Sequence, residues 1–97
     1  MKVSELDLDF IIQYCNLNID KDDRMEMKEL EVYKDASISF IKELTGISDE
    51  DLNNNEFLII PILLLISDMY ENKTLEGYKV SNETFNKIIN IVRGHNL

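Results

Sequence analysis

The side chains that could carry out chemistry are few, and their spacing matches no common reaction. His95 is the one histidine and is expected in a loose tail, so it cannot hold a nucleophile in place. Cys15 falls on the apolar stripe of an expected helix, where a thiol behaves as a small hydrophobe rather than as a reactive group. The sequence therefore predicts no catalytic residue and no enzyme activity.

One acidic segment invites comparison with a calcium-binding loop. It contains Asp20, Asp22, Asp23 and Glu26. The next alternate ligand position is occupied by Arg24, and the glycine that such a loop needs is missing. Carboxylates at this density are typical of a helix N-terminus, where they cap free amides and offset the helix dipole. No metal and no cofactor are predicted.

Composition excludes several classes of partner. The 97 residues are enough for one domain, residues 1–97, and 19 acidic against 10 basic side chains give a net charge of −9. This charge argues against binding a phosphate backbone. A single cysteine cannot form an internal disulfide, and the start of the chain has no signal-peptide pattern, which favours a reducing cytoplasm. The longest apolar run, residues 57–66, is too short to cross a membrane.

With only three glycines and one proline, and no segment interpreted as a half-buried strand, helices joined by short loops are predicted. The expected fold class is all-α, a small four-helix bundle with a short first helix, a long second helix, a buried apolar third helix and a C-terminal fourth helix. The first runs from about residue 7 to 15, capped by Ser4 or Asp7. The second begins near residues 20–23 and ends at Gly46, and the fourth extends from Ser81 to Gly94.

The long second helix carries two apolar faces. Its predicted core face consists of Leu30, Tyr33, Phe40, Ile41 and Leu44. A narrower strip on roughly the opposite side consists of Met25, Val32 and Ala36. We interpret this strip, together with Tyr78 in the connection before the last helix, as a candidate subunit interface. The alternative is that these are scattered apolar residues of an ordinary surface.

The third helix, residues 57–70, is apolar around its whole circumference until Ser67 and Asp68. A helix of this kind is expected in the middle of a bundle. Pro61 allows two interpretations. Either it is the first helical residue, or it kinks a helix that begins near Asn54 or Asn55.

This order of elements resembles the small helical head-tail connector proteins of long-tailed bacteriophages, also described as DNA-packaging proteins. The resemblance covers nearly the whole chain. Its most specific part is residues 62–73, which resemble the family's apolar helix running into a Tyr-Glu-Asn-Arg signature, here Tyr70, Glu71, Asn72 and Lys73. Lys73 stands where the family usually has arginine, and a lysine cannot reproduce the two-point grip of a guanidinium on a carboxylate.

The resemblance implies a structural role in the virion. Copies of the chain would form a ring, a dodecamer in the virion, docked on the portal protein and joined to a downstream head-completion or tail protein. DNA would pass through the ring without specific binding, and a net-acidic lumen fits such passage. The expected location is the head-tail joint of a phage or prophage, and the bacterial host cytoplasm during assembly.

Two other functions compete with this one. An acidic inhibitor that mimics DNA would carry carboxylates spaced along one surface, whereas many acids here fall at expected helix starts, including residues 48–51. A small helical regulatory or antitoxin-like binding protein is the third alternative, and only the match of element order and residues 70–73 disfavours it.

Overall fold

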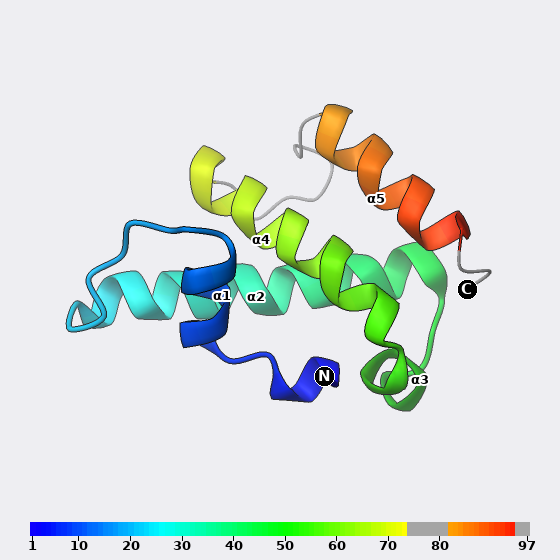
Figure 1. Ribbon diagram of the computed structural model, residues 1–97, viewed down its shortest axis with the longest axis horizontal. Helices are drawn as coiled ribbons and strands as arrows, with labels where there is room; N and C mark the ends of the chain where they lie inside the picture. The colour runs from blue at the N-terminus through cyan, green and yellow to red at the C-terminus, as the bar shows by residue number, and fades with distance from the viewer. Residues whose placement is uncertain (74–81, 95–97) are drawn as a thin grey trace.

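The computed structural model describes residues 1–73 and 82–94, and within these ranges every regular element is a helix (Figure 1). In chain order the elements are the 3-10 turn η1 (Val3–Glu5), α1 (Leu8–Tyr14), α2 (Arg24–Thr45), α3 (Asp49–Asn54), the 3-10 turn η2 (Glu56–Leu58), α4 (Ile59–Asn72) and α5 (Asn82–Gly94). The all-α prediction is confirmed.

The first two helices begin where carboxylate caps predict. The Asp7 side chain accepts a hydrogen bond from Phe10 N at 2.8 Å and so starts α1. Asp7, not Ser4, is therefore the cap. Asp23 caps α2 by accepting from the backbone amides of Met25 and Glu26. These bonds satisfy amides that have no partner inside the helix.

The long helix α2 ends at the predicted glycine. Gly46 has φ of +68°, a left-handed conformation that costs glycine little, and its amide donates to the Lys42 carbonyl at 2.8 Å. The chain then turns into α3, which the four-helix prediction did not include as a helix. Ser48 caps α3 by accepting from Asp51 N at 3.2 Å, and Leu52 anchors the helix in the core.

Pro61 occupies neither of the two places predicted for it. The turn η2 precedes α4. The Asn55 side chain caps the start of η2 by accepting a hydrogen bond from Phe57 N at 3.1 Å. Pro61 is the third residue of α4. In the first turn a backbone amide has no acceptor within the helix, so the missing N–H of proline costs nothing there.

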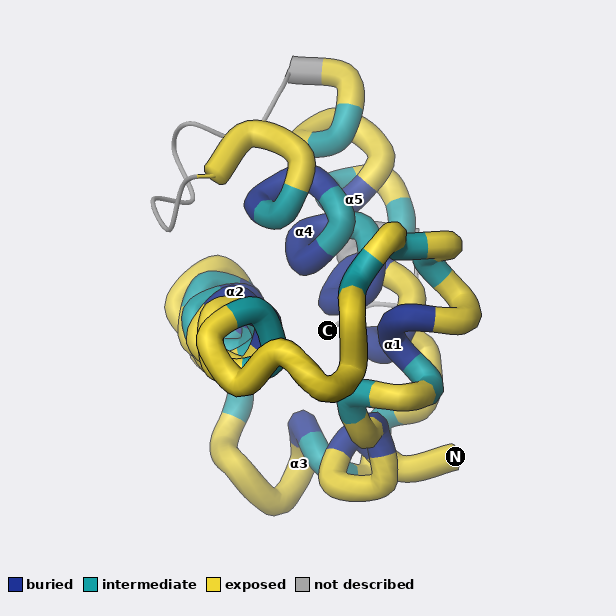
Figure 2. Tube along the Cα trace, turned by 90° about the vertical axis from the view of Figure 1, so that its left-hand side faces the viewer, coloured by how far each residue is buried: buried dark blue, intermediate teal, exposed yellow. Residues whose placement is uncertain are grey.

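The central helix α4 is covered on three sides. It packs on α2 and α5, and the Cys15 thiol at the end of α1 lies 3.7 Å from the Leu63 carbonyl. Figure 2 shows α4, most of it buried, lying among α2, α1 and α5. The prediction of a buried apolar helix holds for most of α4. One side stays uncovered, because Ile60 is 40% exposed, Leu64 is half-buried and no described helix lies over them.

The core face of α2 also differs in part from the prediction. Leu30, Tyr33 and Ile41 are buried, whereas Phe40 is half-buried and Leu44 is exposed. Leu44 lies in the last turn of α2. The fully buried Ser37 takes a place in that face and donates a hydrogen bond to the sulfur of Met69 at 3.6 Å.

The C-terminal helix α5 lies along α4 and contacts η2. Ile88 is buried in the interface, Ile89 is half-buried and Phe85 is 38% exposed. The predicted cap Ser81, the candidate interface residue Tyr78 and the tail residue His95 all lie outside the described residues.

Within residues 1–73 and 82–94, no helix combines the length and apolarity needed to span a bilayer.

Candidate interaction site at the end of the central helix

The four residues of the predicted signature form the last turn of α4 and its end. The helix finishes at Asn72, whose side-chain amide donates to the Asp68 carbonyl at 2.9 Å. Lys73 follows in a left-handed conformation, φ +52°, and its amide donates to the Met69 carbonyl. The left-handed conformation is sterically unfavourable for lysine, because its Cβ approaches the following carbonyl oxygen, whereas glycine has no Cβ.

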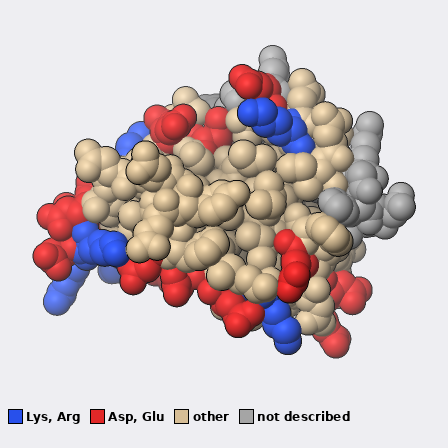
Figure 3. Space-filling view, in the orientation of Figure 1, with Lys and Arg blue, Asp and Glu red and all other residues tan. Residues whose placement is uncertain are grey.

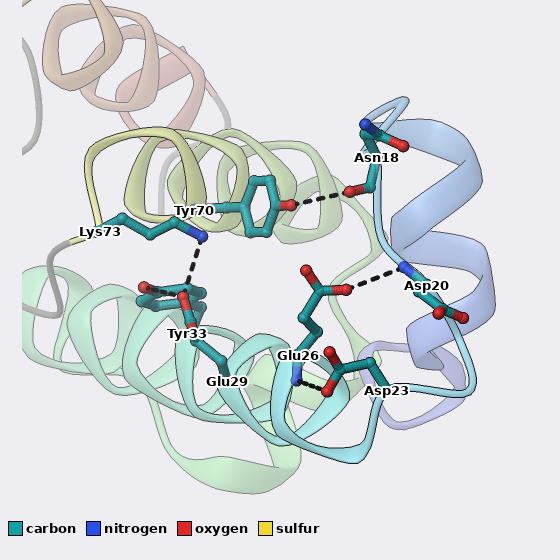
Figure 4. A network of polar contacts seen from close by, with 8 residues as sticks. All are labelled: Asn18, Asp20, Asp23, Glu26, Glu29, Tyr33, Tyr70 and Lys73. Atoms are coloured by element: carbon teal, nitrogen blue, oxygen red, sulfur yellow. Dashed lines mark hydrogen bonds and ion pairs between the residues drawn. The ribbon is translucent and has the colours of Figure 1, made fainter.

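Lys73 reaches from the end of α4 to α2. Its Nζ lies 3.1 Å from Glu29 Oε1 and 4.1 Å from the centroid of the Tyr70 ring. The same Glu29 oxygen accepts a hydrogen bond from the Tyr33 hydroxyl at 2.8 Å (Figure 4). An ammonium held against both a carboxylate and an aromatic face is stabilised by the ion pair and by the negative face of the ring. This four-residue group therefore fastens the end of α4 to α2.

The group changes the acidity of two of its members. The hydrogen bond from Tyr33, followed by that from Lys73, holds the pKa of Glu29 below its ordinary value, because both stabilise the carboxylate. Burial, and then the bond to Glu29, raises the pKa of Tyr33 to about 12. At neutral pH the carboxylate is therefore charged and the phenol keeps the proton that it donates.

Tyr70 extends the group to the connection between α1 and α2. Its hydroxyl donates to the Asn18 carbonyl at 3.3 Å. The same connection is held from α2, where Glu26 accepts a hydrogen bond from Asp20 N at 3.0 Å and Asp23 caps the helix (Figure 4). The end of α4, the start of α2 and the loop before α2 are thus one hydrogen-bonded unit.

The predicted interface strip lies on α2 next to this unit. Met25 is 80% exposed and Val32 is 47% exposed, whereas Ala36 is half-buried. Glu29 stands four residues after Met25 and seven before Ala36, so it shares their side of the helix. The strip is therefore not purely apolar, because the Glu29–Lys73 ion pair interrupts it.

The described residues hold no group of three or more histidine, cysteine, aspartate or glutamate side chains suited to a metal ion. Burial raises the pKa of the Cys15 thiol to about 11, which keeps it protonated at neutral pH. The arrangement around Lys73 offers charge, an aromatic face and exposed apolar atoms. Such groups can take part in ion pairs, cation–π contacts and apolar contacts.

Sequence reasoning identified Tyr70 and Lys73 but not their partners. Glu29 and Tyr33 stand four residues apart on one helix, a spacing that could have identified their hydrogen bond. Glu29 and Lys73 are 44 residues apart, and Tyr70 and Asn18 are 52 apart. No local pattern joins residues at such separations.

Comparisons with protein-family models, with curated proteins and with solved structures find no match to this chain.

Proposed function

We propose that this chain is a structural head-tail connector subunit of a tailed bacteriophage or prophage. In this role copies assemble into a ring on the portal protein, extend the channel for DNA and present a surface to a downstream head-completion or tail protein. The subunit contributes contact surfaces and no catalysis.

The observation that carries the proposal is the resemblance of residues 62–73, taken with their place in the fold. These residues form the body and end of the central helix, and the last of them are exposed but held by hydrogen bonds within the chain. Tyr70 and Lys73 contact two other parts of the chain, at Asn18 and at Glu29. A segment that resembles a family signature and also organises the domain supports the proposal more than a surface match would.

Lys73 has an intramolecular role in the structure. Its single contact with Glu29 Oε1 is the one-point grip expected of an ammonium. We therefore place subunit contacts on the exposed apolar atoms of α2, at Met25 and Val32, rather than on Lys73. A head-to-tail ring needs two different patches on each subunit, and this strip would supply one of them.

The acidic balance of the chain fits a channel for DNA. With a net charge of −9, a ring of such subunits would repel phosphates and let DNA move without stable contacts. The caps Asp7 and Asp23 have their carboxylates turned to helix amides. Helix capping therefore accounts for these two acids without a DNA-mimic role.

The test is reconstitution with the portal protein encoded by the same genome. The purified chain and the portal are mixed, and the mass and symmetry of the product are measured by native mass spectrometry and negative-stain electron microscopy. We expect a ring of this chain stacked on the portal. Val32→Asp should abolish the ring because it buries a charge at the contact, and the exposed change Asn90→Asp on α5 is the matched control.

Failure of the wild-type chain to associate with the portal at any concentration contradicts the proposal. A tight complex with a DNA-binding protein that DNA displaces would support the inhibitor alternative instead. Genes for a portal, capsid and tail beside the coding sequence would add independent support.

A further inference from the structure

The uncovered side of α4 forms a continuous ridge. Ile60, Leu64, Ser67 and Glu71 are spaced at three or four residues and so share one side of the helix. Ile60 and Glu71 are exposed, whereas Leu64 and Ser67 are half-buried. Between residues 59 and 69, all side chains of α4 except Ile60, Leu64 and Ser67 are buried. The ridge is therefore the one side of this segment that no described element covers.

Aromatic side chains extend the ridge at its start and along its flank. Phe57 precedes Ile60 by one turn and is 58% exposed. On the flank, the contact of Cys15 with the Leu63 carbonyl brings the end of α1 next to Leu64. Tyr14, the neighbour of Cys15, is 57% exposed and stacks on the ring of Phe10 at 5.8 Å between centroids. We call Phe10, Tyr14, Phe57, Ile60 and Leu64 the α1–α4 face.

Charge surrounds this face without entering it. Figure 3 views the molecule from the side on which α1 and α4 lie in front of α2. The middle of this surface is mostly uncharged, and acidic side chains recur along its margin with basic side chains among them. Glu56 stands directly before Phe57, and Glu71 stands seven residues after Leu64 on the same side of α4. Both are exposed, and Glu56 pairs with the terminal amine at 3.0 Å. The apolar ridge thus has a carboxylate at each end.

We propose that the α1–α4 face binds an amphipathic helix of another protein, with apolar residues on its contact side and lysine or arginine near both ends. The ridge from Phe57 to Glu71 spans roughly 21 Å, about four helical turns. A helix lying along it would place side chains at i, i+3 or i+4, and i+7 against Ile60 and Leu64, the usual mode of a helix in an apolar groove. One terminal cation would meet Glu71, and the other would share the Glu56 carboxylate with the terminal amine that already pairs with it.

Charge selects this occupant over a second copy of the chain. A symmetric contact between two copies would bring the carboxylates that border one α1–α4 face against those bordering the other. Like charges at an interface disfavour the pairing, whereas a basic segment gains from the same carboxylates. The partner is therefore a basic segment of a different protein.

This surface is distinct from the strip on α2 that carries Met25 and Val32. The inference goes beyond the connector role and does not depend on it, because it requires neither a ring nor a portal.

The test uses a displayed library of random helical peptides of about 16 residues, long enough to span the ridge. The peptides are selected on the full chain and measured afterwards by fluorescence anisotropy. We expect enriched peptides to be basic and to carry apolar residues at helical spacing. Their affinity should fall roughly tenfold or more for Ile60→Ser, which removes a central contact. Leu44→Ser, which changes an exposed aliphatic side chain in the last turn of α2, is the matched control and should leave affinity unchanged.

A second variant tests the charge. Glu71→Lys should lower the affinity for the selected peptides severalfold. It should lower the affinity for acidic or neutral sequence variants of these peptides less. Circular dichroism of each variant establishes that the helices are intact. Three results would overturn the proposal: no enrichment, enrichment without basic bias, or equal binding by wild type and Ile60→Ser. Concentration-dependent dimerisation that Ile60→Ser removes would also overturn it, because the occupant would then be a second copy.

Discussion

At the residue scale, Glu29 shows how an exposed side chain can organise a site. Its side chain is 43% exposed, yet it accepts hydrogen bonds from Tyr33 and Lys73. Ion pairs at such exposure contribute little alone, in the range of about 0.2–1 kcal/mol, because water screens them. The Tyr70 ring next to the ammonium adds about 0.5–1 kcal/mol at an exposed site.

A double-mutant cycle with Glu29→Gln and Lys73→Met should measure this coupling. At pH 7 we expect a coupling energy of about 0.2–1 kcal/mol in the free energy of unfolding, obtained from urea denaturation. The pKa of Glu29 is lowered in the folded state, so its contribution is present above the ordinary value of 4.5 and is lost as pH falls through the folded pKa. An equal coupling energy at pH 7 and at pH 3 would contradict this assignment.

Cys15 gives a second prediction at this scale. A thiol with pKa of about 11 has roughly one thiolate in a thousand molecules at pH 8. Alkylation by iodoacetamide at pH 8 should therefore be roughly 100-fold slower than for an unstructured cysteine peptide. The same protein in guanidinium chloride serves as the control and should react at the peptide rate. Fast alkylation of the folded chain would show that the thiol is reactive after all.

At the element scale, helix starts depend on single carboxylates. Asp23 accepts from two backbone amides at the start of α2, whereas its neighbour Asp22 is exposed and caps nothing there. Asp23→Ala should lower the free energy of unfolding by about 1 kcal/mol, and Asp22→Ala should change it by less than about 0.5 kcal/mol. Urea denaturation of both variants measures the difference. Equal effects would mean that overall charge, not capping, determines the result.

At the scale of the whole molecule, α4 concentrates stability in a small core. Ile62 and Ile60 are the same residue type two positions apart, the first fully buried and the second 40% exposed. Ile62→Ala should cost about 2–5 kcal/mol, because it leaves a cavity as well as losing buried surface. That is a large share of the roughly 5–15 kcal/mol that stabilises a domain.

Ile60→Ala is the control for this prediction. It should change the free energy of unfolding by about 0.5 kcal/mol or less, since the side chain lies on the uncovered ridge. Chemical denaturation of the two variants under one condition gives both values. A large loss for Ile60→Ala would mean that an element covers the ridge in solution.

Much of the fold was predictable because its signals are local. Asp7, Asp23 and Gly46 act on backbone groups within four residues of themselves, and the helix ends follow from them. The short α3 was missed as an element although its cap, Ser48, belongs to an acidic run recognised as a helix start. Pro61 could not be placed, because the turn η2 that precedes α4 has no clear periodicity of its own.

By itself the sequence determined the helical class, the main helix boundaries and the apolar character of α4, since propensity, capping and composition depend on near neighbours. Only the tertiary structure decided which side of α4 stays uncovered, because burial depends on where α1, α2 and α5 pack. It also decided that Lys73 pairs with Glu29 of the same chain. Contacts between residues far apart in sequence arise from packing, and no pattern along the chain records them.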